Sequence, residues 1–421
     1  MSAPSTPDTP GAPGILSPAA CRSCGNADLE QILSLGRTPL ANALLTSEQL
    51  AVDEETFPLD LVFCPQCTLV QITETVSPEK LFREYFYLSS FSDTMLRHAA
   101  EIAAKMIEER GLGRDNLVVE LASNDGYLLR HYKSAGVRVL GIEPAVNIAR
   151  VAQETHGIPT IPEFFTEFLA RMLRLSDFDP DVVHANNVLA HVGDLRDFVF
   201  GLGILLKING VAVVEVPYVK DMIDACEFDT IYHEHLSYFS LTALNELFNR
   251  NLLSIWRVER LPIHGGTLRL YASYKHDPES SVLQLLEEES TWVRDSGFYT
   301  NFSNKVERLR AELVALLRKL KQEGKRIAVY GASAKGSTLL NYCRLGKETL
   351  DYVVDRSTVK QGLYTPGTHL QIHAPEKLLA DMPDYVLLLT WNFADEILEQ
   401  QTEYRQRGGR FIIPIPSVKV V

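Results

Sequence analysis

The chain has 421 residues, of which 46% are hydrophobic and 23% are charged, and this composition is ordinary for a globular protein of about two to three domains. It excludes a chain that is disordered throughout, a collagen-like chain and a disulfide scaffold. Acidic residues outnumber basic residues by 54 to 41, which gives a net charge of −13, so we do not expect nucleic acid as the main partner.

The first 20 residues differ from the rest of the chain. Residues 1–20 contain five prolines among Ser, Thr, Gly and Ala, and because they cannot bury enough apolar surface to fold, we predict a disordered tail. No Lys or Arg precedes Arg22, which argues against a signal peptide. No apolar run approaches the ~20 residues that span a bilayer. We therefore expect a cytoplasmic protein without membrane contact.

Four of the cysteines form two Cys-x-x-Cys pairs, Cys21 with Cys24 and Cys64 with Cys67. Each pair presents two thiolates from one tight turn, and two such turns facing each other make a tetrahedral four-sulfur site that suits Zn²⁺. Four unrelated thiols or a redox pair are the alternatives. Because residues 21–80 are poor in apolar side chains, bound metal would also supply stability. We therefore predict a small structural zinc module over residues 21–80.

The next part of the chain alternates between strands and helices. A helical period over residues 92–110 comes first, and four apolar strands separated by helical stretches follow it. This order predicts a parallel sheet with helices on both faces, a Rossmann-like domain that we place at residues 81–300. The expected strands are Leu117–Leu121, Val137–Ile142, Val182–Ala185 and Val211–Val216.

A second alternating unit ends the chain. We predict a long amphipathic helix over Asn304–Glu323, with Gly324 as its stop signal. We place a domain boundary near residue 300, so that residues 301–421 form a C-terminal Rossmann-like α/β domain. Its expected strands are Ile327–Tyr330, Tyr352–Val354, Tyr385–Thr390 and Phe411–Ile413.

Three pieces of the central unit match a nucleoside-type cofactor site. Small residues after the first strand would let a ligand approach a helix N-terminus, although Ala122 and Asn124 stand where glycine is usual. Glu143 ends the next strand, where a carboxylate can accept both ribose hydroxyl hydrogens, or is simply a solvated charge. The order and spacing favour S-adenosylmethionine over NAD. The candidate contacts are Glu120, Ala122, Ser123, Asn124, Asp125, Gly126, Glu143, Pro144, Asn186 and Asn187.

Residues with acid–base chemistry gather where the central strands should end. Tyr232, Glu234 and His235 follow the fourth strand, and His191 lies just past the third. A histidine with a pKa near neutrality could remove a carbon-bound proton next to a ketone. A neighbouring carboxylate could orient the imidazole, and a phenol could donate to the developing enolate oxygen.

The C-terminal unit carries an imperfect dinucleotide motif. Gly331 to Gly336 approximates Gly-x-Gly-x-x-Gly, but Ser333 replaces the middle glycine, which would crowd a bound pyrophosphate. Lys335 is either a phosphate contact or a solvated lysine. An NAD-dependent oxidoreductase acting on a nucleotide sugar is therefore the alternative function, and a non-catalytic zinc protein is a further one.

Several motifs occur together in a defined order. They are the two Cys-x-x-Cys pairs, YFYLSS at residues 85–90, ELASNDG at 120–126, NNVLAHV at 186–192, YHEH at 232–235 and HGGTLR at 264–269. Over about residues 21–421, the chain resembles the deoxysugar C-methyltransferases, which act on nucleotide-linked 4-keto sugars in antibiotic biosynthesis. The resemblance implies a zinc module, a central S-adenosylmethionine domain and a C-terminal domain that helps to bind the sugar nucleotide.

The same resemblance implies roles for individual residues. The catalytic positions carry over to Tyr232, Glu234, His235 and His191, with His235 as the base, and an N-terminal tyrosine carries over to either Tyr85 or Tyr87. The base would remove a proton next to the ketone, and the enolate would then attack the methyl group of S-adenosylmethionine. We expect dTDP as the nucleotide, whereas the sugar, the methylated carbon and the oligomeric state stay open.

Overall fold

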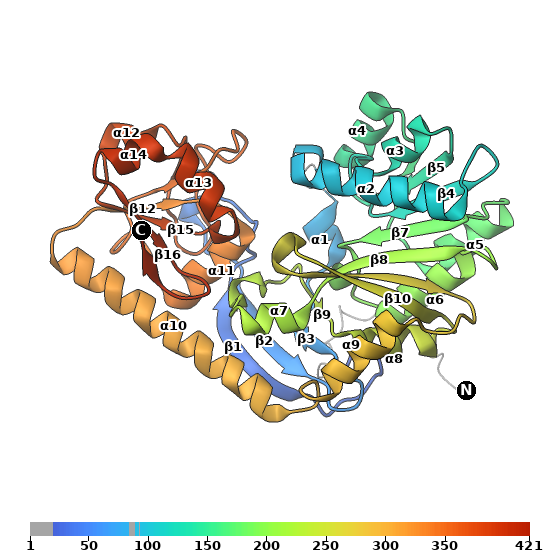
Figure 1. Ribbon diagram of the computed structural model, residues 1–421. Coiled ribbons are helices and arrows are strands. Elements are labelled where there is room, and N and C mark those ends of the chain that lie inside the picture. The colour runs from blue at the N-terminus through green and yellow to red at the C-terminus, as the bar shows by residue number, and fades with distance from the viewer. Residues whose placement is uncertain (1–19, 84–88, 92) are drawn as a thin grey trace, which may run out of the picture.

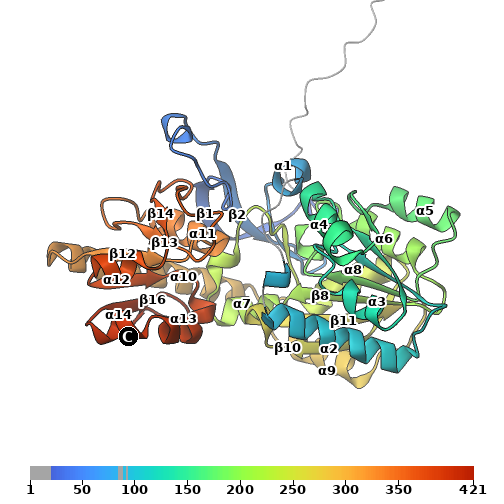
Figure 2. The same cartoon turned by 90° about the horizontal axis from the view of Figure 1, so that it is seen from above.

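The computed structural model describes residues 20–83, 89–91 and 93–421, and three β-sheets follow one another along the chain. A four-stranded sheet comes first, a seven-stranded sheet forms the central unit, and a six-stranded sheet forms the C-terminal unit. In both views the small sheet lies between the two larger ones (Figures 1 and 2). The predicted tail, apart from Ala20, lies outside the described residues. In the part of the chain that is described, no helix has both the length and the apolar character needed to cross a membrane.

The small sheet is antiparallel and contains one strand from far along the chain. The segment after its third strand forms α1 (Pro78–Phe82). The fourth strand, β9, belongs to the segment that follows the central strand β8, so the small sheet and the central unit share a strand pairing. Its strands, in spatial order, are β1 (Glu30–Thr38), β2 (Phe57–Phe63), β3 (Val70–Ile72) and β9 (Ser237–Tyr238).

The two cysteine pairs meet at one end of this sheet. The turn with Cys21 and Cys24 precedes β1, and the turn with Cys64 and Cys67 joins β2 to β3. All four sulfur atoms lie within 4.8 Å of one another, with 3.4 Å between Cys21 and Cys67 and 3.5 Å between Cys24 and Cys64. Ligands at ~2.3 Å from a tetrahedral zinc ion would be about 3.8 Å apart, so the four thiolates fit one ion.

The central sheet confirms the four predicted strands and adds others. Five neighbouring strands are parallel, as expected, but β10 and β11 form an antiparallel hairpin at the edge of the sheet. These two strands are not among the predicted ones, because the charged Arg269 interrupts the apolar pattern of β11 although the strand is fully buried. In spatial order the strands are β10 (Ser254–Leu261), β11 (Thr267–Ser273), β8 (Val211–Pro217), β7 (Val182–Asn186), β4 (Leu117–Leu121), β5 (Arg138–Ile142) and β6 (Thr160–Ile161).

Helices cover both faces of the central sheet (Figure 1). Met95, Ala99 and Ile102 of the helix at residues 93–110 pack with Tyr132 on one face. Leu202 and Leu244 belong to the core on the opposite face. The helices are α2 (Asp93–Arg110), α3 (Leu129–Ser134), α4 (Val146–His156), α5 (Glu167–Leu175), α6 (Leu195–Leu205), α7 (Val219–Asp224), α8 (Leu241–Arg250) and α9 (Ser280–Ser290).

One long helix, α10 (Ser296–Gln322), leads to the C-terminal unit (Figure 1). It begins earlier than predicted because Asp295 caps it through the Gly297 amide, and because Tyr299 and Phe302 extend its buried stripe towards the N-terminus. The helix therefore runs through residue 300 without a break.

The C-terminal sheet confirms the second alternating unit. It is parallel except for its last strand. Its strands, in spatial order, are β14 (Ile372–His373), β13 (Val353–Val354), β12 (Ile327–Tyr330), β15 (Tyr385–Leu388), β16 (Arg410–Ile413) and β17 (Lys419–Val420). Its helices are α11 (Ala334–Cys343), α12 (Lys377–Asp381), α13 (Ala394–Gln400) and α14 (Thr402–Gln406).

We predict that the purified protein carries about one zinc ion per chain, since four thiolates close a tetrahedral site. Cys64→Ser should lose the metal and lower the melting temperature, because zinc binding supplies folding free energy. Metal analysis and thermal unfolding measure the two effects. Cys226→Ser is the matched control, because Cys226 is equally buried but lies outside the cluster. Full zinc content in the Cys64→Ser variant would contradict the assignment.

Candidate functional site

The turn after β4 keeps the backbone shape of a glycine-rich loop without most of the glycines. Ala122 and Asn124 have φ values of 53° and 49°, in the left-handed region that glycine adopts at least cost. Gly126 has a φ of 80°, and a Cβ atom there would lie 2.8 Å from Cγ1 of Ile158. The substitutions at the two usual glycine positions therefore leave the turn intact, at the cost of local backbone strain.

Glu143 lies directly beside this turn. Its carboxylate accepts hydrogen bonds from the backbone amides of Asn124, at 2.9 Å, and of Ala145, at 2.8 Å. Burial raises the pKa of Glu143 to about 7, although the two amides favour the ionised form. The carboxylate is therefore held in place at the carboxyl edge of the sheet, where a ribose hydroxyl pair can be bound.

Buried polar atoms without partners gather at the same edge. Among the described residues, no hydrogen-bond partner exists for one side-chain oxygen each of Glu120, Ser123, Asp125, Asn186 and Asn187. These residues lie in or after β4 and β7, which are neighbours in the sheet. Because buried polar atoms in folded proteins normally have partners, this cluster fits a polar ligand bound across the two strand ends.

Glu120 differs from Glu143 in its surroundings. It is fully buried, and this burial, together with the nearby carboxylates of Glu143, Asp125 and Glu215, holds its pKa well above the usual range. Burial thus disfavours the charged form of Glu120 and favours the carboxylic acid, which can donate a hydrogen bond.

The backbone of Ser89 and Ser90 donates hydrogen bonds to the turn after β4, which carries several of the candidate cofactor contacts. The backbone amide of Ser89 donates to Oδ1 of Asn124 at 2.9 Å, and that of Ser90 donates to Oδ2 of Asp125 at 3.3 Å. Tyr85 and Tyr87 lie outside the described residues. Their place in the active site stays a prediction.

The proposed base, His235, has a defined orientation. Its Nδ1 lies 2.8 Å from the carbonyl oxygen of Thr230, which can only accept a hydrogen bond, so Nδ1 carries the proton. In the neutral ring, Nε2 therefore accepts the hydroxyl hydrogen of Tyr232, whose oxygen is 2.9 Å away. The group that orients the imidazole is thus the Thr230 carbonyl, whereas the carboxylate of the adjacent Glu234 binds elsewhere.

His191 and Glu234 lie beside His235. The ring centroids of His191 and His235 are 5.0 Å apart, and Nδ1 of His191 is 2.6 Å from the carbonyl oxygen of Glu234. Burial lowers the pKa of His191, which keeps its ring neutral. Burial raises the pKa of Glu234 to about 7. By contrast, His233 turns to the small sheet, where its Nε2 is 3.0 Å from the carbonyl oxygen of Pro58.

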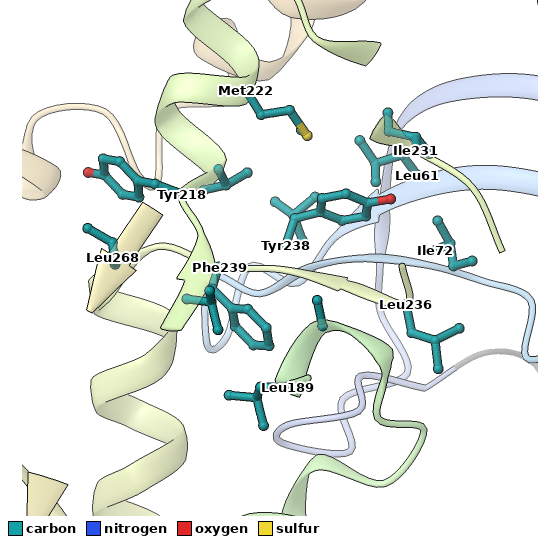
Figure 3. Packing of buried hydrophobic residues seen from close by; sticks show 14 of the residues in the cluster. Leu61, Ile72, Leu189, Tyr218, Met222, Ile231, Leu236, Tyr238, Phe239 and Leu268 are labelled. Carbon is teal, nitrogen blue, oxygen red and sulfur yellow. The ribbon is translucent and has the colours of Figure 1, made fainter. Parts of the chain in front are cut away.

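The segment that carries Glu234 and His235 forms hydrogen bonds with both the central unit and the small sheet. The amide of Leu236 donates to Ala190, next to His191, and its carbonyl accepts from Ile72 of β3. Figure 3 shows Leu236, Tyr238 and Phe239 packed among side chains of the small sheet and of the central unit, including Leu61, Ile72, Leu189, Tyr218 and Leu268. The site geometry therefore depends on contacts with both units.

The sequence motifs pointed neither to Glu215 nor to Asn42. Glu215 of β8 is fully buried and lies 2.9 Å from Nε2 of His98 and 2.7 Å from Nε of Arg269. Burial alone would raise the pKa of Glu215, but His98 and Arg269 hold it below its usual value. A carboxylate inside an otherwise apolar strand was a signal that could have been used. Asn42, which donates to Glu234, gave no such signal.

The imperfect Gly-x-Gly-x-x-Gly motif of the C-terminal unit and the helix after it lie against the segment that leads to the candidate catalytic residues 232–235. Lys335 lies 4.9 Å above the ring of Trp391, and Nε1 of Trp391 donates to Asp229 at 2.7 Å. Oγ1 of Thr338 on α11 donates to the carbonyl oxygen of Ile231 at 3.3 Å. The start of this helix is therefore packed against the residues just before Tyr232.

Three family models match successive parts of the chain. They are described as "Putative zinc binding domain" for residues 21–82, "Methyltransferase domain" for residues 95–257 and "C-methyltransferase C-terminal domain" for residues 262–416.

The chain is also similar to a solved structure, that of magnesium protoporphyrin IX methyltransferase (ChlM) from Synechocystis PCC 6803 with bound SAM. The similarity covers 43% of this chain and 79% of the ChlM chain, with 14% identity and a TM-score of 0.34.

A curated protein is similar over nearly the full length. The C-methyltransferase NovU of Streptomyces niveus is 37% identical over 405 residues, which are 95% of this chain and 96% of NovU. The four clustered cysteines agree with the match to a zinc-binding domain, and the central sheet agrees with the match to a methyltransferase domain. The chain therefore belongs to the S-adenosylmethionine-dependent C-methyltransferases that include NovU, the family that its motifs resemble, with zinc in its N-terminal domain.

Proposed function

We propose that this C-methyltransferase acts on a nucleotide-linked 4-keto deoxysugar, with dTDP as the expected nucleotide, and methylates a carbon next to the ketone. Methyl transfer to carbon requires a nucleophilic carbon, which a sugar supplies after loss of a proton beside a carbonyl group. The orientation of His235 carries the proposal, because its Nε2 is the unprotonated nitrogen of the neutral ring and lies next to a phenol.

The roles follow from this pair of groups. A ketone oxygen placed near Tyr232 could accept its hydroxyl hydrogen, while Nε2 of His235 takes the proton from the neighbouring carbon. The resulting imidazolium keeps its Nδ1–H on the Thr230 carbonyl. When bound, S-adenosylmethionine would supply an electrophilic methyl group, which the carbanion would take as the bond between the methyl carbon and sulfur breaks and S-adenosylhomocysteine leaves. His191 is the alternative base, and the resemblance adds either Tyr85 or Tyr87 as a second phenol.

Residues of all three units meet beside Tyr232. They include Pro39 and Ala41 of the N-terminal unit, and Ser337 and Asn341 of the C-terminal unit. We place the nucleotide-linked part of the substrate towards the C-terminal unit. Lys335 stays a candidate contact for the diphosphate, although Glu227 and Asp229 lie near enough for its charge to oppose the rise that burial causes in their pKa values.

We also propose the division into functional units at residues 21–80, 81–300 and 301–421. Strand β9 and helix α10 connect these units, since β9 pairs with β3 and α10 crosses the second boundary. The NAD-dependent alternative is not retained, because the C-terminal unit matches the C-terminal domain of C-methyltransferases.

A panel of nucleotide-linked sugars tests the substrate class. We expect dTDP-linked 4-keto deoxysugars to gain one methyl group in the presence of S-adenosylmethionine, and the corresponding 4-hydroxy sugars to remain unchanged because they cannot form an enolate. Mass spectrometry of the products measures the gain. Methylation of the 4-hydroxy sugars at the same rate would contradict enolate formation.

We predict that S-adenosylmethionine binds more weakly at pH 6 than at pH 8. The pKa of Glu143 is raised to about 7, and ribose hydroxyls donate to the ionised carboxylate, so affinity is lost as the pH falls below 7. The loss should approach tenfold per pH unit, measured by calorimetry. The control, Glu143→Gln, should bind more weakly at pH 8 and show a flatter pH dependence. An unchanged affinity in a folded Glu143→Gln variant would place the ribose elsewhere.

We predict that His235→Ala retains both ligands but lowers turnover by about 100-fold to 10,000-fold, the usual loss when a general base is removed. If the wild-type enzyme exchanges the hydrogen next to the ketone with deuterated water, the variant should lose this exchange. His191→Ala is measured in parallel by the same two assays. Near-normal turnover in His235→Ala together with an inactive His191→Ala would reverse the roles of the two histidines.

A further inference from the structure

The zinc-bearing unit reaches the catalytic cluster through one side chain. Asn42 lies in the loop after β1, and its Nδ2 is 2.6 Å from Oε1 of Glu234, 192 positions further along the chain. Asn42 is exposed, whereas Glu234 is only 5% exposed. Among the described residues, no other side chain donates a hydrogen bond to this carboxylate. The amide therefore covers the carboxylate from the solvent side.

The loop that carries Asn42 is fixed at both ends. Thr38, just before it, is the last residue of β1. Leu45, just after it, exchanges two backbone hydrogen bonds with Tyr364 of the C-terminal unit, at 2.9 and 2.8 Å. Further along, the carboxylate of Glu54 accepts a hydrogen bond from the Gly367 amide at 2.8 Å. The position of the Asn42 amide is therefore set by two units that are separate from the central sheet.

The surroundings of Glu234 show why one amide matters. His191, at the end of η3 (Leu189–His191), contacts the backbone carbonyl of Glu234, and His233 and His235 are its neighbours in the chain. No lysine or arginine among the described residues forms an ion pair with it. Burial raises the pKa of Glu234, and the hydrogen bond from Asn42 opposes that effect. The amide is thus the one described group that favours the ionised carboxylate.

We propose that Asn42 is a positioning residue for methyl transfer, and that its amide holds the Glu234 carboxylate, and with it the segment that carries His235, in place. The zinc-bearing unit then completes the active site as well as supporting the fold. This inference rests on the proposed function, because it treats Glu234 as part of the catalytic cluster.

Two substitutions at this exposed position test the contact itself. Asn42→Leu keeps the approximate size but removes the donor, and Asn42→Asp places a second carboxyl group beside Glu234. The titration midpoint of Glu234, followed by NMR with ¹³C-labelled glutamate and assigned with Glu234→Gln, should rise by about one pH unit in Asn42→Leu and further in Asn42→Asp. A midpoint that is unchanged in both variants overturns the proposal.

Kinetics then test whether the contact serves catalysis. In Asn42→Leu, the acidic limb of the kcat profile should move to higher pH by the same amount, and kcat at pH 7 should fall about fivefold, while the affinity for S-adenosylmethionine and the zinc content stay unchanged. Asn251→Leu is the matched control, because the Asn251 amide donates to Leu247, within α8, and its profile should match the wild-type profile.

The results distinguish a failure of the role proposed for Asn42 from a failure of the proposed substrate class. A shifted NMR midpoint with an unshifted kcat profile overturns the positioning role, and equal losses in Asn42→Leu and Asn251→Leu do so as well. If the midpoint shifts as expected but no nucleotide-linked keto sugar is methylated by the wild-type protein, the contact is supported and the proposed substrate class fails.

Discussion

The pairing of β3 with β9 is the contact on which the active-site geometry depends. It consists of two residue pairs, Val70 with Tyr238 and Gln71 with Ser237, and the Ile72 amide extends it to Leu236. So short a ladder is weak alone, but Tyr238 is buried in the core that the two units share (Figure 3). Because the ladder begins directly after His235, the small sheet determines where the catalytic segment lies.

This arrangement connects the zinc site with the segment that carries the proposed base. The second cysteine pair forms the turn between β2 and β3, so bound zinc stabilises the strand with which β9 pairs. The turn with the first cysteine pair contacts the same region. Arg22, which lies between Cys21 and Cys24, donates hydrogen bonds from its guanidinium to the carbonyl oxygens of Ile72 and Glu74. Bound zinc would thus influence the segment with the proposed base through the small sheet.

Burial sets the charge states of the carboxylates at the two halves of the site. At the proposed cofactor edge, burial raises the pKa of both Glu120 and Glu143, whereas the two backbone amides that donate to Glu143 favour its ionised form. At the catalytic segment, burial acts on Glu234, and a single amide from another unit opposes it. Burial has the opposite effect on the nearby imidazole of His191, whose pKa it lowers, so the neutral ring is favoured.

Patterns within short stretches of the chain predicted the local structure. The bounds of β4 and β12 match the expected strands, because each is a continuous apolar run, and the spacing of the cysteine pairs predicted the four-sulfur cluster. The β10–β11 hairpin was missed because Arg269 is polar in sequence but is neutralised by Glu215, which lies opposite it in the sheet. The β3–β9 pairing and the contact of Asn42 with Glu234 were decided only by the tertiary structure, since no local propensity specifies which distant residues meet across packed units.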